Sequence, residues 1–283
     1  GIKVGLFLPN CPQFVVAFYG ILKAGGTVVN YSPLYAEPEL LHQIEDSQTD
    51  IMVTLNLEIL YGKMERLMKE SRLQKLVVAT MPEVLPFPKS LLFPIVRRRV
   101  IARVDRDSGH IPFQQLLNND GNYAPMDIDT TDTAVLQYTG GTTGVPKGAM
   151  LSHGALYINV LQGAGWADEI EFGAEKILAV LPFFHVFAMT GIMNLGIRIG
   201  AELIMHPRFE LEAVMRDIAE KNPTFMSGVP TMFAAMNGHP DLKAFDLSSL
   251  KFCLSGGAPL PVEIRTQFEK SSGCSLAEGY GLT

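Results

Sequence analysis

The stretch Tyr138–Gly148, YTGGTTGVPKG, concentrates residue types that suit the binding of an anion. Glycines let backbone N–H groups approach a phosphate closely, threonines add hydroxyl donors, and Lys147 adds a compact positive charge. The ordinary P-loop patterns GxxxxGKS and GxxxxGKT do not fit, because Pro146 precedes the lysine and Gly148 follows it. We therefore predict a phosphate-binding loop rather than a plain glycine-rich turn. Its candidate ligands are Thr139, Gly140, Gly141, Thr142, Thr143, Gly144 and Lys147.

Three further stretches place polar or very small residues directly after apolar runs. They are Leu181–Phe187 (LPFFHVF), Ser255–Leu260 (SGGAPL) and Glu278–Thr283 (EGYGLT). Open α/β sheets bind their ligands beyond the carboxyl ends of the strands, where these stretches would lie. A single histidine such as His185 is nevertheless more often a satisfied core residue, and SGGAP alone can be a simple strand-to-helix turn. Taken singly, the three stretches leave both interpretations open.

Taken together and in this order, the four motifs resemble those of the adenylate-forming superfamily. That superfamily comprises acyl-CoA synthetases, peptide-synthetase adenylation domains and firefly luciferases, and the resemblance covers essentially the whole chain. It implies that His185 positions the carboxylate, that adenine lies against the glycine turn, and that Tyr280 stacks on the base. The implied catalytic residues are His185, Lys147 and Thr283, and the further nucleotide-binding residues are Gly257, Ala258, Tyr280, Gly281 and Thr283; no residue is assigned as a metal ligand.

The same resemblance implies an acyl tunnel along the helices that begin near Val186 and Thr231. Candidate substrate contacts are Phe184, His185, Met189, Val229 and Met232, although Phe, Val and Met at such positions are more often plain core. The amino-acid sequences of the motifs are most similar to those of bacterial medium- and long-chain fatty-acid–CoA ligases. Such enzymes activate a fatty acid with ATP and Mg²⁺ as an acyl-adenylate and then transfer it to coenzyme A. An aryl- or other carboxylate–CoA ligase, and a non-catalytic nucleotide-binding relic, stay open as alternatives.

Composition and charge narrow the class of protein. The chain has 283 residues, 47% of them hydrophobic and 18% charged, which is typical of a globular protein. The net charge of −6 does not favour nucleic acid as a partner. Three cysteines without CxxC spacing indicate reduced thiols, and the sequence opens without a signal peptide, so we expect a cytoplasmic protein with a homodimer as a candidate assembly.

Arg97–Arg99 lies between two apolar runs, Leu91–Val96 and Val100–Ile101. One interpretation is a solvated basic turn. The other is an interfacial patch, in which apolar side chains enter the lipid headgroups and the arginines meet anionic lipid. The second interpretation predicts a peripheral contact of residues 91–103 with the inner face of the membrane.

Predicted strands and helices that could position these motifs alternate along most of the chain. Short apolar runs separated by helical patterns predict an α/β fold with mainly parallel sheets flanked by helices. The expected strands lie at 3–8, 27–30, 51–54, 75–80, 133–138, 148–151, 177–181, 201–205, 224–227, 252–254 and 275–278. The expected helices lie at 12–24, 38–47, 59–71, 152–165, 186–197, 211–220, 231–237 and 261–270.

Two packed subdomains are expected, 1–165 with the phosphate loop and 166–283 with the other motifs, both parts of one AMP-binding domain. Proline-rich residues 81–122 are expected to form an irregular excursion. Because both ends look cut, we expect the N-terminal part of a longer enzyme, without its β-barrel and C-terminal domain. Such a piece would be nearly inactive alone.

Overall fold

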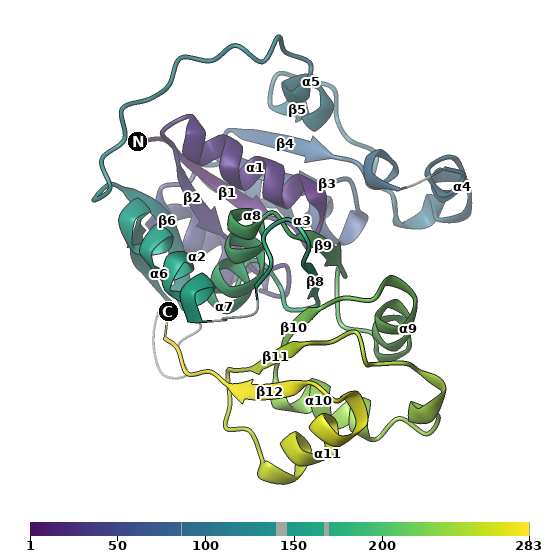
Figure 1. The fold of residues 1–283 in the computed structure, drawn as a ribbon. Helices are drawn as coiled ribbons and strands as arrows, with labels where there is room; N and C mark the ends of the chain where they lie inside the picture. Colours follow the sequence, from purple (N-terminus) through teal and green to yellow (C-terminus); the bar gives the residue numbers. More distant parts are fainter. Residues whose placement is uncertain (86, 140–145, 167–169, 283) are drawn as a thin grey trace. The chain divides into compact units, whose positions relative to one another are not determined.

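The computed structural model describes residues 1–85, 87–139, 146–166 and 170–282 (Figure 1). They form two compact units, Gly1–Ala155 and Leu156–Thr283, each built on its own sheet. Both sheets are mainly parallel and alternate with helices along the chain, so the expected α/β class is confirmed. The expected subdomain boundary at 165 lies further along, inside the helix α6 (His153–Trp166), and stays a prediction.

The first unit contains a seven-stranded sheet in the order β5-β4-β3-β1-β2-β6-β7. Its strands are parallel apart from the antiparallel pair β6 and β7. β2 is buried along its whole length, as expected for an inner strand of a parallel sheet with both faces covered. The strands are β1 (Lys3–Phe7), β2 (Thr27–Asn30), β3 (Ile51–Leu55), β4 (Lys75–Ala79), β5 (His110–Pro112), β6 (Thr133–Thr139) and β7 (Lys147–Ser152). The helices are α1 (Pro12–Lys23), α2 (Glu37–Ser47), α3 (Glu58–Glu70), η1 (Met81–Val84), α4 (Lys89–Val96), η2 (Arg98–Val100) and α5 (Phe113–Leu117).

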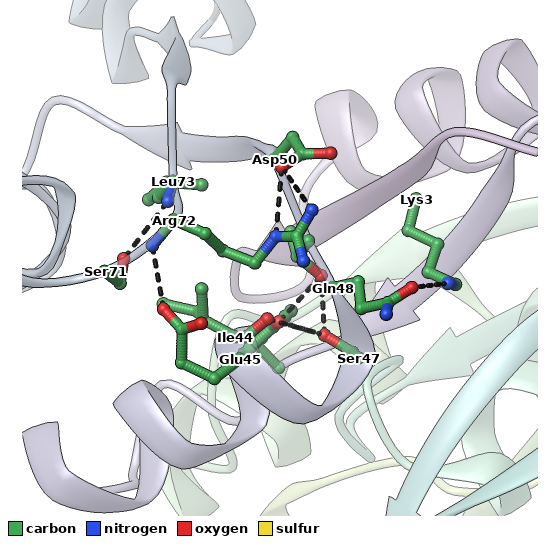
Figure 2. A network of polar contacts seen from close by, with 11 residues as sticks. Lys3, Ile44, Glu45, Ser47, Gln48, Asp50, Ser71, Arg72 and Leu73 are labelled. Carbon is green, nitrogen blue, oxygen red and sulfur yellow. Dashed lines mark hydrogen bonds and ion pairs between the residues drawn. The ribbon is translucent and has the colours of Figure 1, made fainter.

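Polar contacts fix the turn by which α2 leads into β3 (Figure 2). The Arg72 guanidinium donates to Asp50 Oδ1 through Nε at 3.0 Å and Nη2 at 2.9 Å. The Arg72 backbone N–H donates to Glu45 Oε1 at 2.8 Å, and Lys3 Nζ donates to Gln48 Oε1 at 3.0 Å. These contacts join the end of α2 to β1 and to the residues after α3. The last turn of α2 is therefore a fixed platform, and it carries Asp46, which contacts the phosphate-loop strand described below.

Residues 81–122 are less irregular than the sequence predicts. They include α4, the short helix α5, and the strand β5, which pairs in parallel with β4 through Leu76 and His110. The expectation of an irregular excursion is therefore wrong for these elements. Three residues ending in Pro112 are too few to show the alternation that identifies a strand, and proline is tolerated there because β5 is an edge strand.

The second unit contains a five-stranded parallel sheet in the order β12-β11-β10-β8-β9. Alternate strand residues point to opposite faces. On one face Leu178, Met226, Cys253 and Leu276 are buried in a core cluster with side chains of α9, α10 and α11. The strands are β8 (Lys176–Ala179), β9 (Glu202–Met205), β10 (Phe225–Gly228), β11 (Phe252–Ser255) and β12 (Ser275–Glu278). The remaining helices are α7 (Val186–Ala188), η3 (Met189–Asn194), α8 (Leu195–Ile199), α9 (Leu211–Lys221), α10 (Pro230–Asn237), η4 (Leu242–Ala244) and α11 (Val262–Ser272).

The helix expected at 186–197 is present but not uniform. α7 continues into the π-helical segment η3 and then into α8, which ends at Gly200 with φ +69°. π-helical turns inside helices are frequent at functional sites, because the wider turn re-aims side chains. In the described part of the chain, no helix is both long enough and apolar enough to cross a membrane.

Candidate functional site

The phosphate loop connects the two antiparallel strands β6 and β7. Thr139 is opposite Lys147 in the strand register, and the Thr139 hydroxyl donates to the Lys147 carbonyl at 3.5 Å. Lys147 is exposed, which leaves its ammonium group accessible to an anion. Gly140, Gly141, Thr142, Thr143 and Gly144 lie outside the described residues.

Tyr138 fixes the start of this loop. Its hydroxyl donates to the Asp46 carboxylate at the end of α2. A Cβ added to Gly148 would lie 2.9 Å from Tyr138 Cε2, so the tyrosine ring occupies the space above this glycine. The two residues that flank the loop are thus matched in shape, and only glycine fits at 148 without a shift of the ring.

The other three motifs meet at one edge of the second sheet. Because β8, β10, β11 and β12 are parallel, their carboxyl ends lie together, and the residues that follow them form one rim. Backbone contacts continue the pairing past the strands: Gly256 N donates to Gly228 O at 3.1 Å, and Gly279 N donates to Ser255 O at 2.7 Å. The sheet therefore places the histidine motif, the glycine turn and the tyrosine loop side by side.

A hollow of about 620 Å³ lies at this rim. Of the predicted residues, it is lined by His185, Gly257, Tyr280 and Gly281. We call it the histidine pocket. Tyr280 is 90% exposed, so its ring has a free face beside the glycine turn. The structure thus brings together four of the predicted site residues from three separate motifs.

The glycine turn forms a flat wall of this pocket. A Cβ on Gly256 would lie 2.9 Å from the Phe187 ring and 3.3 Å from the Gly279 carbonyl. Gly257 has φ +80°, a conformation that other residues adopt only with strain, and Val229 Cγ1 would lie 3.6 Å from an added Cβ. Gly256 is therefore required by the close approach of the Phe187 ring and Gly257 by its backbone conformation, and at both positions the wall offers a ligand ring only main-chain atoms. Ala258 is exposed beside this wall and is not among the pocket's lining residues.

His185 enters the pocket between the end of β8 and the start of α7. Its backbone N–H donates to Pro182 O at 3.0 Å and its carbonyl accepts from Met189 N at 2.9 Å, so the main chain fixes its position. The imidazole lies 4.5 Å from the Phe184 ring, centroid to centroid. The ring is exposed, yet the protein around it removes enough water to lower its pKa below the ordinary value of 6.5. The neutral imidazole is therefore the main form at neutral pH.

A second hollow, of about 580 Å³, continues from the first along the face of the sheet opposite the core cluster, between the sheet and residues of α6, η3 and α8. The two share Gly191, Leu195, Leu254, Gly279 and Tyr280 among their lining residues. We call the second one the apolar pocket, because its lining is mainly hydrophobic; it includes Trp166, Ile177, Leu195, Phe225, Phe252 and Leu254.

The apolar pocket ends in polar groups near the amino ends of the strands. Phe225 and Phe252 are register partners, with stacked rings 5.7 Å apart. Below them Lys251 Nζ lies 3.2 Å from Glu175 Oε1, and the Thr224 hydroxyl donates to the same carboxylate. Glu175 is buried and its pKa is lowered, because hydrogen bonds from Thr224, Glu171 N and Lys251 outweigh the desolvation that acts in the opposite direction. The ion pair between Lys251 and Glu175 therefore forms one end of the apolar pocket.

The predicted acyl contacts have different surroundings. Phe184 and Met189 are buried, and Met232 packs against the core cluster on the other face of the sheet. Val229 lies beside Gly257. None of these four is among the described lining residues of the apolar pocket, so their role in acyl binding stays a prediction. Thr283 lies outside the described residues.

The apolar pocket is also lined by four residues that were not predicted from the sequence: Ile177, Leu195, Phe225 and Phe252. The strand periodicity could have identified two of these residues. Phe225 and Phe252 occupy the first positions of two short strands, out of phase with the buried Met226 and Cys253, so they point to the opposite face of the sheet.

No group of three His, Cys, Asp or Glu side chains that could hold a metal ion occurs in the described ranges of the chain.

Comparisons with known proteins place this geometry in context. A family model described as "AMP-binding enzyme" matches residues 1–283. The chain is 40% identical over 295 residues to a long-chain-fatty-acid–CoA ligase of Bacillus subtilis, covering 100% of the chain and 51% of the relative. It is 34% identical over 292 residues to the enzyme of that name in Escherichia coli O157:H7, with the same coverage.

Among solved structures, an anthranilate CoA ligase in complex with anthranoyl-AMP matches with a TM-score of 0.81. The sequence identity is 22%, and the match covers 100% of this chain and 50% of that one. At this identity the likeness shows the fold alone. The chain spans about half the length of the curated relatives it matches.

Proposed function

Since the chain belongs to the AMP-binding enzyme family of adenylate-forming enzymes, we propose that it activates a medium- or long-chain fatty acid with ATP. The product is an acyl-adenylate, which passes to coenzyme A. One observation carries the proposal: the histidine pocket, with its flat glycine wall, opens into the apolar pocket. A polar reacting end and an alkyl tail each have a place there. The proposed reaction is the one named for the full-length relatives, and this chain covers about half of their length.

The nucleotide has two sets of candidate contacts. The base lies against Gly256 and Gly257, where the missing side chains leave a flat surface, and the Tyr280 ring stacks on it. The loop between Thr139 and Lys147 takes the phosphates, and the ammonium group faces the distal ones. Gly281 and Ala258 border the same nucleotide, and Thr283 is assigned to the α-phosphate.

In the first step a carboxylate oxygen of the fatty acid attacks the α-phosphorus of ATP. The bond from that phosphorus to the bridging oxygen breaks, and pyrophosphate leaves with the electron pair. Lys147 and the loop N–H groups stabilise the charge that builds up on pyrophosphate. The protein does little covalent work, so most of its contribution is position and electrostatics.

His185 orients the carboxylate in this step. A neutral imidazole can donate one hydrogen bond to a carboxylate or adenylate oxygen without adding a buried charge. The lowered pKa of His185 supports that role at neutral pH. The Phe184 ring beside it limits the rotation of the imidazole.

Mg²⁺ and coenzyme A complete the proposal. Mg²⁺ is assigned to the phosphates of ATP, with which it would arrive and whose negative charge it would offset. In the second step the coenzyme A thiol loses its proton to solvent, its sulfur attacks the acyl carbonyl carbon, and AMP leaves with the electrons of the carbon–oxygen bond. The expected homodimer and cytoplasmic location stay predictions.

The apolar pocket takes the acyl chain. A volume of about 580 Å³ is in the usual range of small-ligand sites, and its lining is mostly aliphatic and aromatic. Its aromatic residues, Trp166, Phe225 and Phe252, also suit a flat aryl acid. An aryl–CoA ligase is therefore the second candidate function.

ATP–pyrophosphate exchange by the full-length protein, assayed with a series of carboxylates, tests the proposal. The expected result is exchange that rises from acetate to medium and long alkanoates, with the adenylate trapped as a hydroxamate by hydroxylamine. Exchange with benzoate and anthranilate but with no alkanoate would establish the aryl alternative. Nucleotide binding without exchange for any acid would reduce the protein to a binding relic.

A further inference from the structure

The segment of residues 87–104, which contains α4, differs in charge from the rest of the chain. It carries five Lys and Arg residues and no Asp or Glu, while the remaining residues carry 18 Lys and Arg against 29 Asp and Glu. We call it the α4 segment. The five cations are Lys89, Arg97, Arg98, Arg99 and Arg103, and none makes an ion pair in the described parts of the chain. This basic surface is thus free to bind an external anionic partner.

The same segment exposes a stripe of large apolar side chains. No residue of α4 is buried. Leu91 and Ile95 are 64% and 74% exposed, and Leu92 and Val96 are 50% and 72% exposed. Residues four apart lie one above the other on a helix, so these two pairs form one continuous face. Phe87 at 80% and Val100 at 42% exposure extend it beyond both ends of the helix.

The fold holds both ends of the α4 segment and leaves its middle outside. Before it, the Glu83 carboxylate accepts from Thr80 N at 3.2 Å. After it, Ile101 bridges to Leu57, and Ala102, which is buried, donates its N–H to Asn56 O at 2.9 Å. Figure 1 shows α4 beyond the end of the β4 arrow, away from the other strands of its sheet. The exposed apolar face is therefore presented by an anchored structure.

We propose that the α4 segment docks on a membrane surface rich in anionic lipid. A soluble protein rarely exposes a contiguous apolar patch without a use for it. A lipid interface offers both complements in one place, acyl chains for the apolar stripe and phosphates for the arginines at its end. With eight residues α4 is about 12 Å long, far shorter than a bilayer, so it lies in the plane of the interface. This inference goes beyond the proposed reaction and does not depend on it.

Sedimentation of the protein with lipid vesicles, without any substrate, tests the docking. We expect binding to equimolar phosphatidylcholine and phosphatidylglycerol, and little binding to phosphatidylcholine alone. The variant Arg97→Gln/Arg98→Gln/Arg99→Gln should bind the anionic vesicles roughly a hundredfold more weakly, since each basic residue near such a surface contributes about 1 kcal/mol. High salt should reduce wild-type binding toward the level of the variant, because it screens these charges.

Two further variants separate location from charge. Arg216→Gln/Lys243→Gln/Lys270→Gln removes three exposed cations elsewhere, and it should bind the anionic vesicles like the wild type. Leu92→Ser/Ile95→Ser leaves every charge in place and should lose binding, because the apolar stripe no longer enters the headgroups. All the changed side chains are exposed, so thermal unfolding should be unaltered, which separates lost docking from lost folding.

Three outcomes would overturn the proposal. The first is a wild-type protein that ignores anionic vesicles at low salt. The second is equal binding by the wild type and the Arg97–Arg99 variant. The third is concentration-dependent self-association in analytical ultracentrifugation that Leu92→Ser/Ile95→Ser abolishes, with no vesicle binding; the apolar stripe would then be a contact between copies of this chain.

Discussion

At the scale of single residues, the proposed tasks of His185 and Lys147 differ because their surroundings differ. His185 is fixed by two backbone hydrogen bonds and partly desolvated, whereas Lys147 is exposed at the end of a strand hairpin. The histidine is therefore suited to donate a directed hydrogen bond to a carboxylate held close to it. The lysine is suited to attract a strongly charged one.

His185→Gln tests the first task through pH. With the wild type, we expect kcat/KM for adenylate formation to fall as pH drops through a value below 6.5, because protonation then replaces the neutral imidazole. The sign follows from desolvation, which favours the neutral form. The variant should be roughly tenfold to a hundredfold slower at neutral pH, since its amide positions the carboxylate less well, and its profile should lack this acid limb. An acid limb that survives unchanged in the variant would assign it to another group.

Lys147→Ala tests the second task through the choice of nucleotide. We expect the dissociation constant of ATP to rise roughly tenfold to a hundredfold, which is the usual worth of one charge-assisted hydrogen bond. AMP should be almost unaffected, because it lacks the distal phosphates. Lys270→Ala, at another exposed position, serves as the control in isothermal titration calorimetry. Equal weakening of ATP and AMP contradicts the assignment of Lys147 to the distal phosphates.

At the scale of elements, the π-helical segment η3 contributes a residue where the two pockets meet. Gly191 lies in this segment and lines both of them. An added Cβ there would meet only the Phe187 ring, at the ordinary contact distance of 3.7 Å. A larger side chain can therefore replace this glycine without a clash. Such a side chain would occupy the space where the two pockets meet.

Gly191→Leu should therefore shorten the acceptable acyl chain without weakening the fold. We expect kcat/KM for palmitate to fall roughly tenfold or more while acetate is spared, because the new side chain fills the passage. Thermal stability should hold or rise, since leucine favours helix over glycine. Gly20→Leu, on an exposed turn of α1 with no atom within 4 Å of the added Cβ, is the matched control. Equal loss for both acids would mean that the passage does not carry the acyl chain.

The elements also show how far the sequence could predict this structure. Strands such as β2 and β3 are short runs rich in β-branched and apolar residues between turn signals, and their positions were predicted within a residue or two. The edge strand β5 was not, because pairing with β4 rather than its own three residues makes it a strand. The apolar pocket was also not predicted. Phe225 and Met226 are adjacent apolar residues, and the sequence does not show which of them faces the core. Only the packing of α9, α10 and α11 decides which face becomes core.

At the scale of the whole molecule, charge is segregated. The net charge is −6, yet the α4 segment alone carries five cations, so an anionic surface repels most of the chain and attracts one segment. Such a distribution orients a protein at a membrane, where fatty acids partition. Membrane docking by the α4 segment would therefore support the proposed activation of a fatty acid, since a substrate that resides in lipid reaches the enzyme most readily from that surface.

This link predicts a difference between substrates that depends on how they are delivered. For octanoate dissolved in water, the variant Arg97→Gln/Arg98→Gln/Arg99→Gln should keep the wild-type kcat/KM, because the changed side chains belong to neither pocket. For palmitate supplied in phosphatidylglycerol vesicles at limiting lipid, its rate should fall roughly tenfold, as fewer molecules reside at the surface. Arg216→Gln/Lys243→Gln/Lys270→Gln should lose neither activity. If the arginine variant lost both activities equally, the arginines would act on the catalytic site; if it lost neither while vesicle binding was weakened, docking would not be the route by which the fatty acid arrives.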